Sequence, residues 1–285
     1  MKPLIFIFFI FELISPCAVA IEDGAGNYLP GFYGDFQMAS LPKRSGFYLN
    51  NLFSAYQDNQ ASTGNLLEMP GIIYVSDKTL LGATLASGLW PTVQISKAKD
   101  GGNSQSRLGL GDPYLMPVLL SRDWDTIKLQ GFEGIVAPLG YYNKDQLSTG
   151  CNIWTFDHNL AVTFMLPSDN ELSVDVGYMQ NTQNTATHYK NGDELHIDYL
   201  LGHYFQSDFA LGITGSYYRQ VTADQAPAQS LANVFNRADT IGPAVMYTPP
   251  LGKRNINMSL KWLHEFNVQG HIPQDYILWR VDSPF

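Results

Sequence analysis

Residues 255–265 read Asn-Ile-Asn-Met-Ser-Leu-Lys-Trp-Leu-His-Glu, and this stretch decides the fold class. Apolar side chains occupy the even-numbered positions from Ile256 to Trp262, and polar side chains occupy the positions between them. A helix would require apolar residues every three to four positions. The period of two therefore predicts a strand with one apolar and one polar face.

The same alternation recurs along the chain, most clearly over residues 154–164, 171–178, 194–204 and 209–220. Strands of this kind fit two architectures. One is a sandwich with a dry interior, and the other is a lipid-embedded barrel with a wet interior.

The lengths of the connections separate the two architectures. The predicted strands number about twelve, at residues 46–56, 68–76, 79–90, 110–121, 126–137, 152–165, 170–180, 194–206, 208–220, 237–248, 254–266 and 275–285. Links after even-numbered strands are tight, whereas those after odd-numbered strands are longer and polar, at residues 57–67, 91–109, 138–151, 181–193, 221–236 and 267–274. This rhythm predicts an all-β, antiparallel transmembrane β-barrel over residues 46–285, with short periplasmic turns and longer extracellular loops.

The two ends of the chain point to the outer membrane of a Gram-negative bacterium. Residues 1–20 resemble a secretory signal peptide, with an apolar run and a small-x-small pattern at residues 18–20. Cys17 offers a lipid-anchor alternative, which the preceding proline disfavours. Residues 21–45 lack alternation, so we expect them either to enter the lumen as a plug or to lie in the periplasm. The last strand ends on Phe285, as an outer-membrane insertion signal does.

A barrel in lipid must close, because lipid cannot satisfy the backbone groups of a strand edge. Twelve strands enclose a lumen wider than the eight-stranded barrels that side chains fill. Aromatic side chains are expected to form girdles at the membrane interfaces; the candidates are Trp90, Trp124, Trp154, Tyr217, Trp262 and Trp279.

The polar faces of the predicted strands supply the candidate site. The lumen-lining candidates are Lys128, Gln130, Glu133, Asp157, Asp175, His196, Asp198, Tyr218, Gln220, Arg237, Asp239, Lys261 and Glu265. Lys128 and Glu133 have opposite parity, so a bulge at Gly131 is needed to bring both inward. His196 and Asp198 share one strand face, but two ligands are fewer than a typical four-coordinate metal site requires, so no metal is expected.

Composition and motifs exclude several classes of function. The formal net charge of −9 argues against a nucleic-acid partner. No nucleophile elbow and no closely spaced His-Ser pair is present, so no catalytic residue and no cofactor is expected, although a hydrolase assembled from different strands stays an alternative. Signal cleavage would leave Cys151 as the only cysteine, and no intrachain disulfide could then form. The expected partners are membrane lipid and a small-molecule solute, and the oligomeric state is left open.

The chain also resembles a known family of outer-membrane proteins associated with the meta-pathway of phenol degradation. The resemblance covers residues 27–285 and rests on Gly109-x-Gly111-Asp112, Ala137-Pro138-x-Gly140, Asn152-x-Trp154-Thr155-Phe156-Asp157, Asn184-x-x-Thr187-x-Tyr189-x-x-Gly192-Asp193-Glu194-x-His196-x-Asp198-Tyr199, Gly215-x-Tyr217-Tyr218-x-Gln220-x-Thr222-x-Asp224 and Gly242-Pro243. It implies a barrel that transports aromatic or other hydrophobic compounds. The expected function is thus an outer-membrane channel for small solutes, with a closed structural or binding barrel as the alternative.

Overall fold

The computed structural model describes residues 27–60, 63–100, 103–206, 208–225, 235–251 and 254–284. The predicted signal peptide, residues 21–26 of the N-terminal segment and Phe285 lie outside these ranges. The described part of the chain has no helix long and apolar enough to span a membrane.

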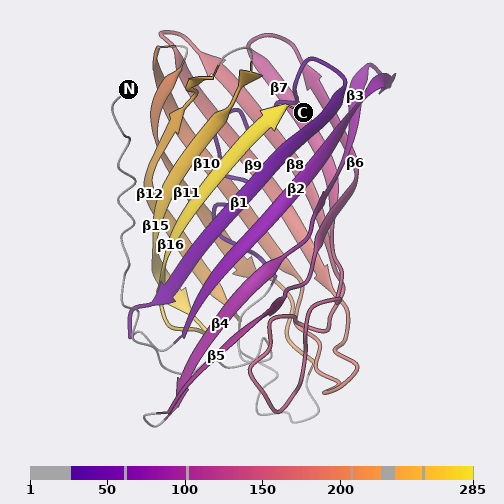
Figure 1. Cartoon of the computed structure of the whole chain (residues 1–285), viewed down its shortest axis with the longest axis vertical. Helices are drawn as coiled ribbons and strands as arrows, with labels where there is room; N and C mark the ends of the chain where they lie inside the picture. The colour runs from indigo at the N-terminus through magenta and orange to yellow at the C-terminus, as the bar shows by residue number, and fades with distance from the viewer. Residues whose placement is uncertain are drawn as a thin grey trace.

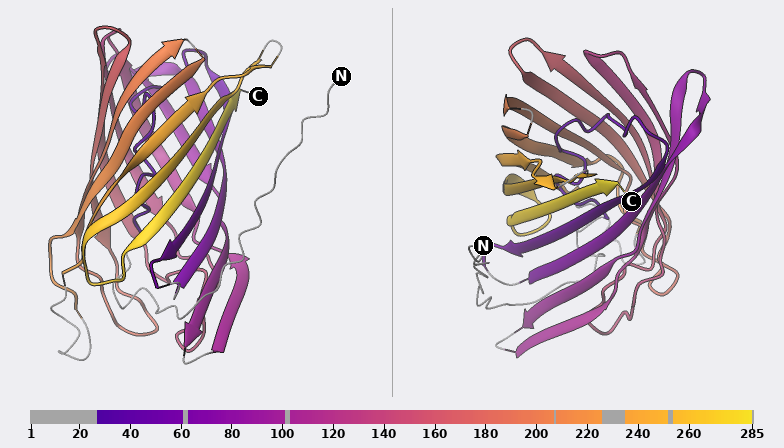
Figure 2. Two further views of the ribbon diagram at one scale, coloured as in Figure 1. Left: turned by 90° about the vertical axis from the view of Figure 1, so that its left-hand side faces the viewer. Right: turned by 45° about the horizontal axis from the view of Figure 1, so that its top comes forward.

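The chain folds into a closed, 12-stranded antiparallel barrel (Figures 1 and 2). Its strands are β1 (Gly46–Asp58), β2 (Thr63–Leu80), β3 (Ala83–Trp90), β4 (Val93–Asp100), β5 (Asn103–Leu110), β6 (Tyr114–Asp123), β7 (Ile127–Val136), β8 (Thr155–Leu166), β9 (Asn170–Asn181), β10 (Glu194–Gln206), β11 (Phe209–Gln220), β12 (Arg237–Tyr247), β15 (Asn257–Gln269) and β16 (Gln274–Pro284). Consecutive strands pair, and β1 pairs with both β16 and β2, which closes the barrel. A small hairpin of β13 (Pro250–Leu251) and β14 (Arg254–Asn255) lies between β12 and β15.

Two of the twelve wall strands are interrupted at the same level. β3 continues as β4 after Pro91 and Thr92, and β5 continues as β6 after residues 111–113, which include Pro113. Proline cannot donate a ladder hydrogen bond, so a regular pairing stops there. The Gly111 amide donates to the Thr92 carbonyl (2.9 Å), which joins the two breaks.

Several predicted loops are strands instead. Residues 57–67 and 91–109 were expected to be long polar loops, but β2 begins at Thr63, and β4 and β5 form a hairpin that extends beyond the rest of the wall (Figure 1). The last long link shortens to residues 270–273. The long loops are therefore three, at residues 137–154, 182–193 and 221–236. Strands that leave the hydrocarbon lose the apolar face that marks them in the sequence, although their pairing continues.

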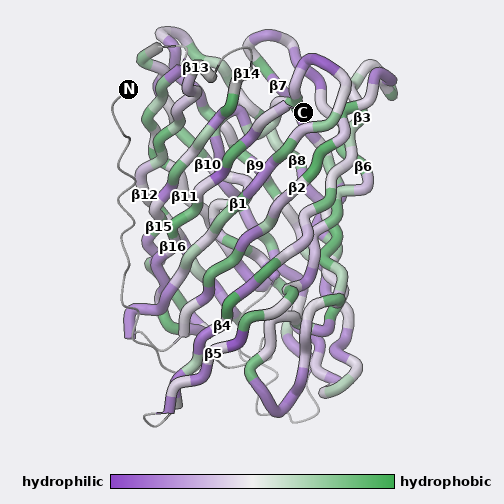
Figure 3. Tube along the Cα trace, in the orientation of Figure 1, coloured by the Kyte–Doolittle hydropathy of each residue, from purple (hydrophilic) through white to green (hydrophobic). Residues whose placement is uncertain are grey.

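Apolar and polar residues alternate along the strands (Figure 3). The outward face is apolar, with Leu160, Ile213 and Trp262 each about half exposed. Four of the predicted girdle tryptophans, at positions 124, 154, 262 and 279, are exposed in the same way. Trp90 is the exception, because it points inward, is 3% exposed and donates from its ring nitrogen to the Asn50 side chain (2.7 Å). Its ring packs against Gly71, which has no side chain to exclude it.

The inward face is divided into two halves. Strands β1–β3, β6, β7 and β16 present mainly apolar side chains to the lumen, including Leu52, Met69 and Leu278. Strands β8–β12 and β15 present polar ones, including Thr163, Asp175 and Lys261. The lumen therefore has one oily wall facing one wall of charged and hydrogen-bonding groups.

Candidate functional site

Residues 27–41 run through the lumen as a plug (Figure 2). At the long-loop end, the Asn27 amide donates to Thr155 (2.7 Å) at the start of β8. Near the short-turn end, the Ala39 amide donates to Thr163 (3.2 Å) and its carbonyl accepts a hydrogen bond from Ser121 (3.0 Å). The plug thus crosses most of the length of the barrel.

A charge cluster fixes the middle of the plug to β15 and β16. The Asp35 carboxylate lies 3.2 Å from the Lys261 ammonium and 3.5 Å from the Arg280 guanidinium, and it accepts a hydrogen bond from Ser259 (2.8 Å). Burial alone would raise the pKa of Asp35, but the charges of Lys261 and Arg280 outweigh it and lower the pKa. A buried charge is stable only when it is paired and hydrogen-bonded, so this cluster holds the plug in one position.

The same cations also bind the plug backbone. The Lys261 ammonium donates to the carbonyls of Gly31 (2.6 Å) and Gly34 (3.0 Å), and Arg280 donates to the Phe32 carbonyl. The backbone here has no helical or sheet partner, so these side chains satisfy groups that would otherwise be buried unpaired.

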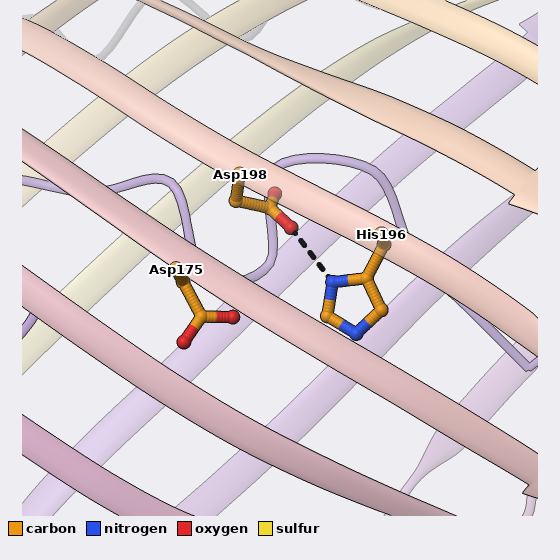
Figure 4. Close-up of side chains that lie close together, drawn as sticks. All are labelled: Asp175, His196 and Asp198. Carbon is orange, nitrogen blue, oxygen red and sulfur yellow. Dashed lines mark hydrogen bonds and ion pairs between the residues drawn. The ribbon is translucent and has the colours of Figure 1, made fainter.

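A second cluster surrounds His196 on the polar wall. Its Nδ1 lies 3.2 Å from Asp198 Oδ2, and its Nε2 lies 3.1 Å from Asp157 Oδ1 (Figure 4 shows the Asp198 side). Asp175 lies on β9 directly opposite Asp198 of β10. All four side chains are at most 1% exposed.

Two tyrosines of the plug enclose this histidine. The rings of Tyr28 and Tyr33 stack on the His196 ring, with centroids 4.6 and 5.5 Å away. Their hydroxyls donate to Asp198 (2.8 Å) and Asp157 (2.6 Å). The close approach depends on Gly177, the cross-strand neighbour of His196, because an added Cβ there would lie 1.9 Å from Nε2.

A cavity of about 990 Å³ lies between the plug and the long loops. Its lining combines the oily wall and plug aromatics, including Phe32, Leu67, Met69 and Tyr114, with polar groups such as Glu265. Apolar lining with a few convergent polar groups is typical of a small-molecule site.

The structure places ten of the thirteen predicted lumen residues on the inward face. Lys128 contacts the plug through Gln37 (3.1 Å). Gln130, Asp157, Asp175, His196, Asp198, Tyr218, Gln220, Lys261 and Glu265 are all buried against the lumen. Of these, the residues in direct contact with the plug include Asp157, Asp198 and Lys261.

Three predictions were wrong, because Glu133, Arg237 and Asp239 point outward. β7 pairs with β8 in continuous register, so the expected bulge at Gly131 does not exist and Glu133 takes the outward parity. Glu133 pairs with the outward His158 (2.6 Å), and Asp239 pairs with Arg219 (2.6 Å). These pairs lie near the long-loop ends of their strands, where the outward face no longer needs to be apolar.

Sequence reasoning did not identify the plug residues that complete the site, namely Tyr28, Phe32, Tyr33 and Asp35. Their segment has no periodicity. The one available signal is the concentration of aromatic residues and glycine in residues 28–36.

A closed barrel with an apolar outer belt, a divided lumen and a docked plug defines a transmembrane β-barrel of the channel type. The model of the family described as "Putative MetA-pathway of phenol degradation" matches residues 59–281, and the chain belongs to that family.

Solved structures show the same fold. The COG4313 outer membrane channel from Pseudomonas putida F1 is similar with a TM-score of 0.71 at 15% identity, covering 91% of this chain and all of that one. A FadL homologue from Pseudomonas aeruginosa has a TM-score of 0.43 at 8% identity, covering 84% of this chain and 89% of that one. The KdgM porin in complex with oligogalacturonate has a TM-score of 0.45 at 8% identity, covering 84% and 99%. A search of curated proteins found no match.

Proposed function

We propose that this protein is an outer-membrane channel that admits small hydrophobic or aromatic compounds. The observation that carries the proposal is the cavity at the long-loop end, whose floor consists of plug aromatics and the oily wall of the lumen. Its membership of a phenol-degradation family and its likeness in fold to an outer membrane channel support the same function.

The cavity fits an aromatic solute better than a sugar or an ion. Phe32, Tyr33 and Tyr114 present rings to one another in tilted and edge-to-face arrangements, with centroids 4.8–5.4 Å apart. A planar ring that enters among them would extend this packing and bury apolar area. Tyr276 and Glu265, joined by a 3.0 Å hydrogen bond, offer polar atoms for a hydroxyl group.

Passage beyond the cavity requires the plug to move. The plug contacts are hydrogen bonds and ion pairs at several levels of the lumen, so each can break separately. A solute that displaces Tyr33 or Phe32 would loosen the segment that continues to Asp35. The plug therefore acts as the gate of the channel in this proposal.

Flux measurements on proteoliposomes test the proposal. We expect a neutral aromatic solute to enter faster than an equally sized sugar. Leu67→Asp places a charge in the cavity wall and should slow the aromatic solute selectively. Leu139→Asp, on an exposed loop, is the matched control. Equal flux of the aromatic solute in both variants would refute the assignment of the cavity.

The docked plug itself favours a second candidate, a closed barrel that binds its ligand without transport. Calorimetric binding of the aromatic solute together with an absence of any flux, even after removal of the plug contacts, would favour that function.

A further inference from the structure

Asp175 and Asp198 form an unusual pair in the wall. They are register partners on β9 and β10, so their side chains leave the sheet side by side on the same face. Both are 0% exposed. Like charges directly opposite one another destabilise an antiparallel pair, and here water cannot screen them.

The surrounding groups do not balance these charges. Asp198 accepts hydrogen bonds from the Gly31 amide (3.0 Å) and from the Tyr28 hydroxyl, but neither oxygen of Asp175 has a hydrogen-bond partner among the described residues. Asp157 adds a third carboxylate, and the His196 imidazole contributes at most one positive charge. Lys261, the cation of the neighbouring cluster, is paired with Asp35. A buried carboxylate without any partner is costly, so an additional positive group is required.

The geometry points to a metal ion as that group. We propose that Asp175, Asp198 and His196 bind a divalent transition-metal cation inside the lumen. One ligand atom from each residue lies within 4.8 Å of the other two, and Figure 4 shows the two carboxylates on the Nδ1 side of the imidazole. Metal–nitrogen and metal–oxygen bonds of about 2.1 Å place opposite ligands roughly 4.2 Å apart, so small side-chain rotations complete the site.

The chemistry of the ligands selects the kind of ion. Imidazole nitrogen together with carboxylate oxygen suits Zn²⁺ and its first-row neighbours, whereas Ca²⁺ and Mg²⁺ prefer oxygen ligands alone. Counting from the sequence gave only His196 and Asp198 as ligands. The third comes from a separate strand, 21 positions before His196, and only the register of β9 with β10 brings it there.

The site would connect the ion to the plug. Asp198 is both a proposed ligand and the acceptor for Gly31 and Tyr28, while Asp157 holds the other nitrogen of His196. A carboxylate on the remote side of a histidine ligand fixes its orientation and increases its basicity. The bound cation would thus order the residues on which Tyr28 and Tyr33 dock. Asp157 and both tyrosines line the cavity, which provides a route of entry.

Titration of the purified, chelator-stripped full-length barrel with Zn²⁺ tests the proposal. We expect one ion per chain by calorimetry. Co²⁺, used as a spectroscopic probe of the same protein, should show visible absorption of mixed nitrogen and oxygen ligation. Asp175→Asn removes a ligand with little change in volume and should weaken Zn²⁺ binding about 100-fold or more.

Glu171→Gln is the matched control, since Glu171 is also an inward carboxylate of β9 with 0% exposure but accepts hydrogen bonds from Ser173 and Gln37. It should bind Zn²⁺ as the wild type does. Absence of stoichiometric Zn²⁺ binding, an aqueous Co²⁺ spectrum in the wild type, or equal affinity in the Asp175 variant would each overturn the site. These outcomes are independent of solute flux, so the channel proposal and the metal site can fail separately.

Discussion

Replacing Asp35 by asparagine should release the plug, and the contacts of this residue allow the effect to be worked out. The carboxylate neutralises two cations at 3.2 and 3.5 Å, and both Lys261 and Asp35 are almost fully buried. Removal of one partner from a buried ion pair costs about 3–5 kcal/mol. The asparagine can keep the hydrogen bond from Ser259, and an undocked plug lets water reach Lys261. We therefore expect docking to weaken by about 3 kcal/mol, a roughly hundredfold shift toward the undocked state.

Cys151 provides the measurement. Its thiol donates to the Asn27 side chain at the start of the plug (3.0 Å), and it is the only cysteine in the described part of the chain. Burial raises the pKa of the Cys151 thiol, with a further rise from the nearby Asp112 carboxylate. Because the thiolate is the reactive species, labelling by a maleimide should be slow while the plug is docked. Release of the plug should expose the thiol and accelerate labelling in isolated outer membranes.

Two variants control this experiment. Asp145→Asn removes the same charge from an exposed loop pair with Lys144, which contributes little to stability, and should label at the wild-type rate. Cys151→Ser sets the background. If the Asp35 variant labels no faster than the wild type, or if both asparagine variants accelerate labelling equally, the charge cluster does not hold the plug.

Three further predictions concern the wall and the plug. Leu160→Arg puts a charge on the lipid face and should cost about 2–4 kcal/mol of stability in a bilayer, measured by urea unfolding from liposomes, whereas Leu139→Arg on an exposed loop should be neutral. Gly177→Ala should displace His196 and lower the temperature at which the barrel unfolds in heat-modified electrophoresis, by a destabilisation of about 1–3 kcal/mol; Gly131→Ala, where the nearest atom to the new methyl lies 3.8 Å away, should leave that temperature unchanged. Because the folded pKa of Asp35 is lowered, its contribution to docking is complete above the ordinary aspartate pKa and is lost as pH falls through the lowered value. The Cys151 exposure measured after labelling at a fixed pH should therefore be unchanged by preincubation from pH 8 to about pH 5, and an increase already at mildly acidic pH would contradict the cluster.

The sequence predicted the strands best where the two faces of the wall differ most. In β8–β11 and β15 the lipid side is apolar and the lumen side is polar, so the period of two is plain and every strand was predicted within three residues at either end. Strands β1–β3 pack an oily lumen wall as well as lipid, and the alternation is weaker there. That is why the ends of β2 and the continuation into β4 and β5 were missed.

Parity alone decided which side chains enter the lumen, and charge was a poor guide. His196, Asp198 and Lys261 followed the period of their strands and point inward, whereas Glu133, Arg237 and Asp239 were expected inward because they are charged. The outward charges pair with each other near the ends of the strands, outside the apolar belt. Trp90 was expected to lie in a girdle for the opposite reason, as an aromatic residue, and Gly71 makes room for it inside.

The amino-acid sequence by itself determined a closed antiparallel barrel, because alternation along each strand is a local property and lipid leaves no other stable arrangement for such strands. The tertiary structure alone decided what the lumen contains. The path of residues 27–41, the junction of Asp35 with Lys261 and Arg280, and the meeting of Asp175 with Asp198 and His196 all join positions far apart in the chain or on separate strands. Such contacts depend on strand register and on the route of an aperiodic segment, and neither leaves a periodic trace in the sequence.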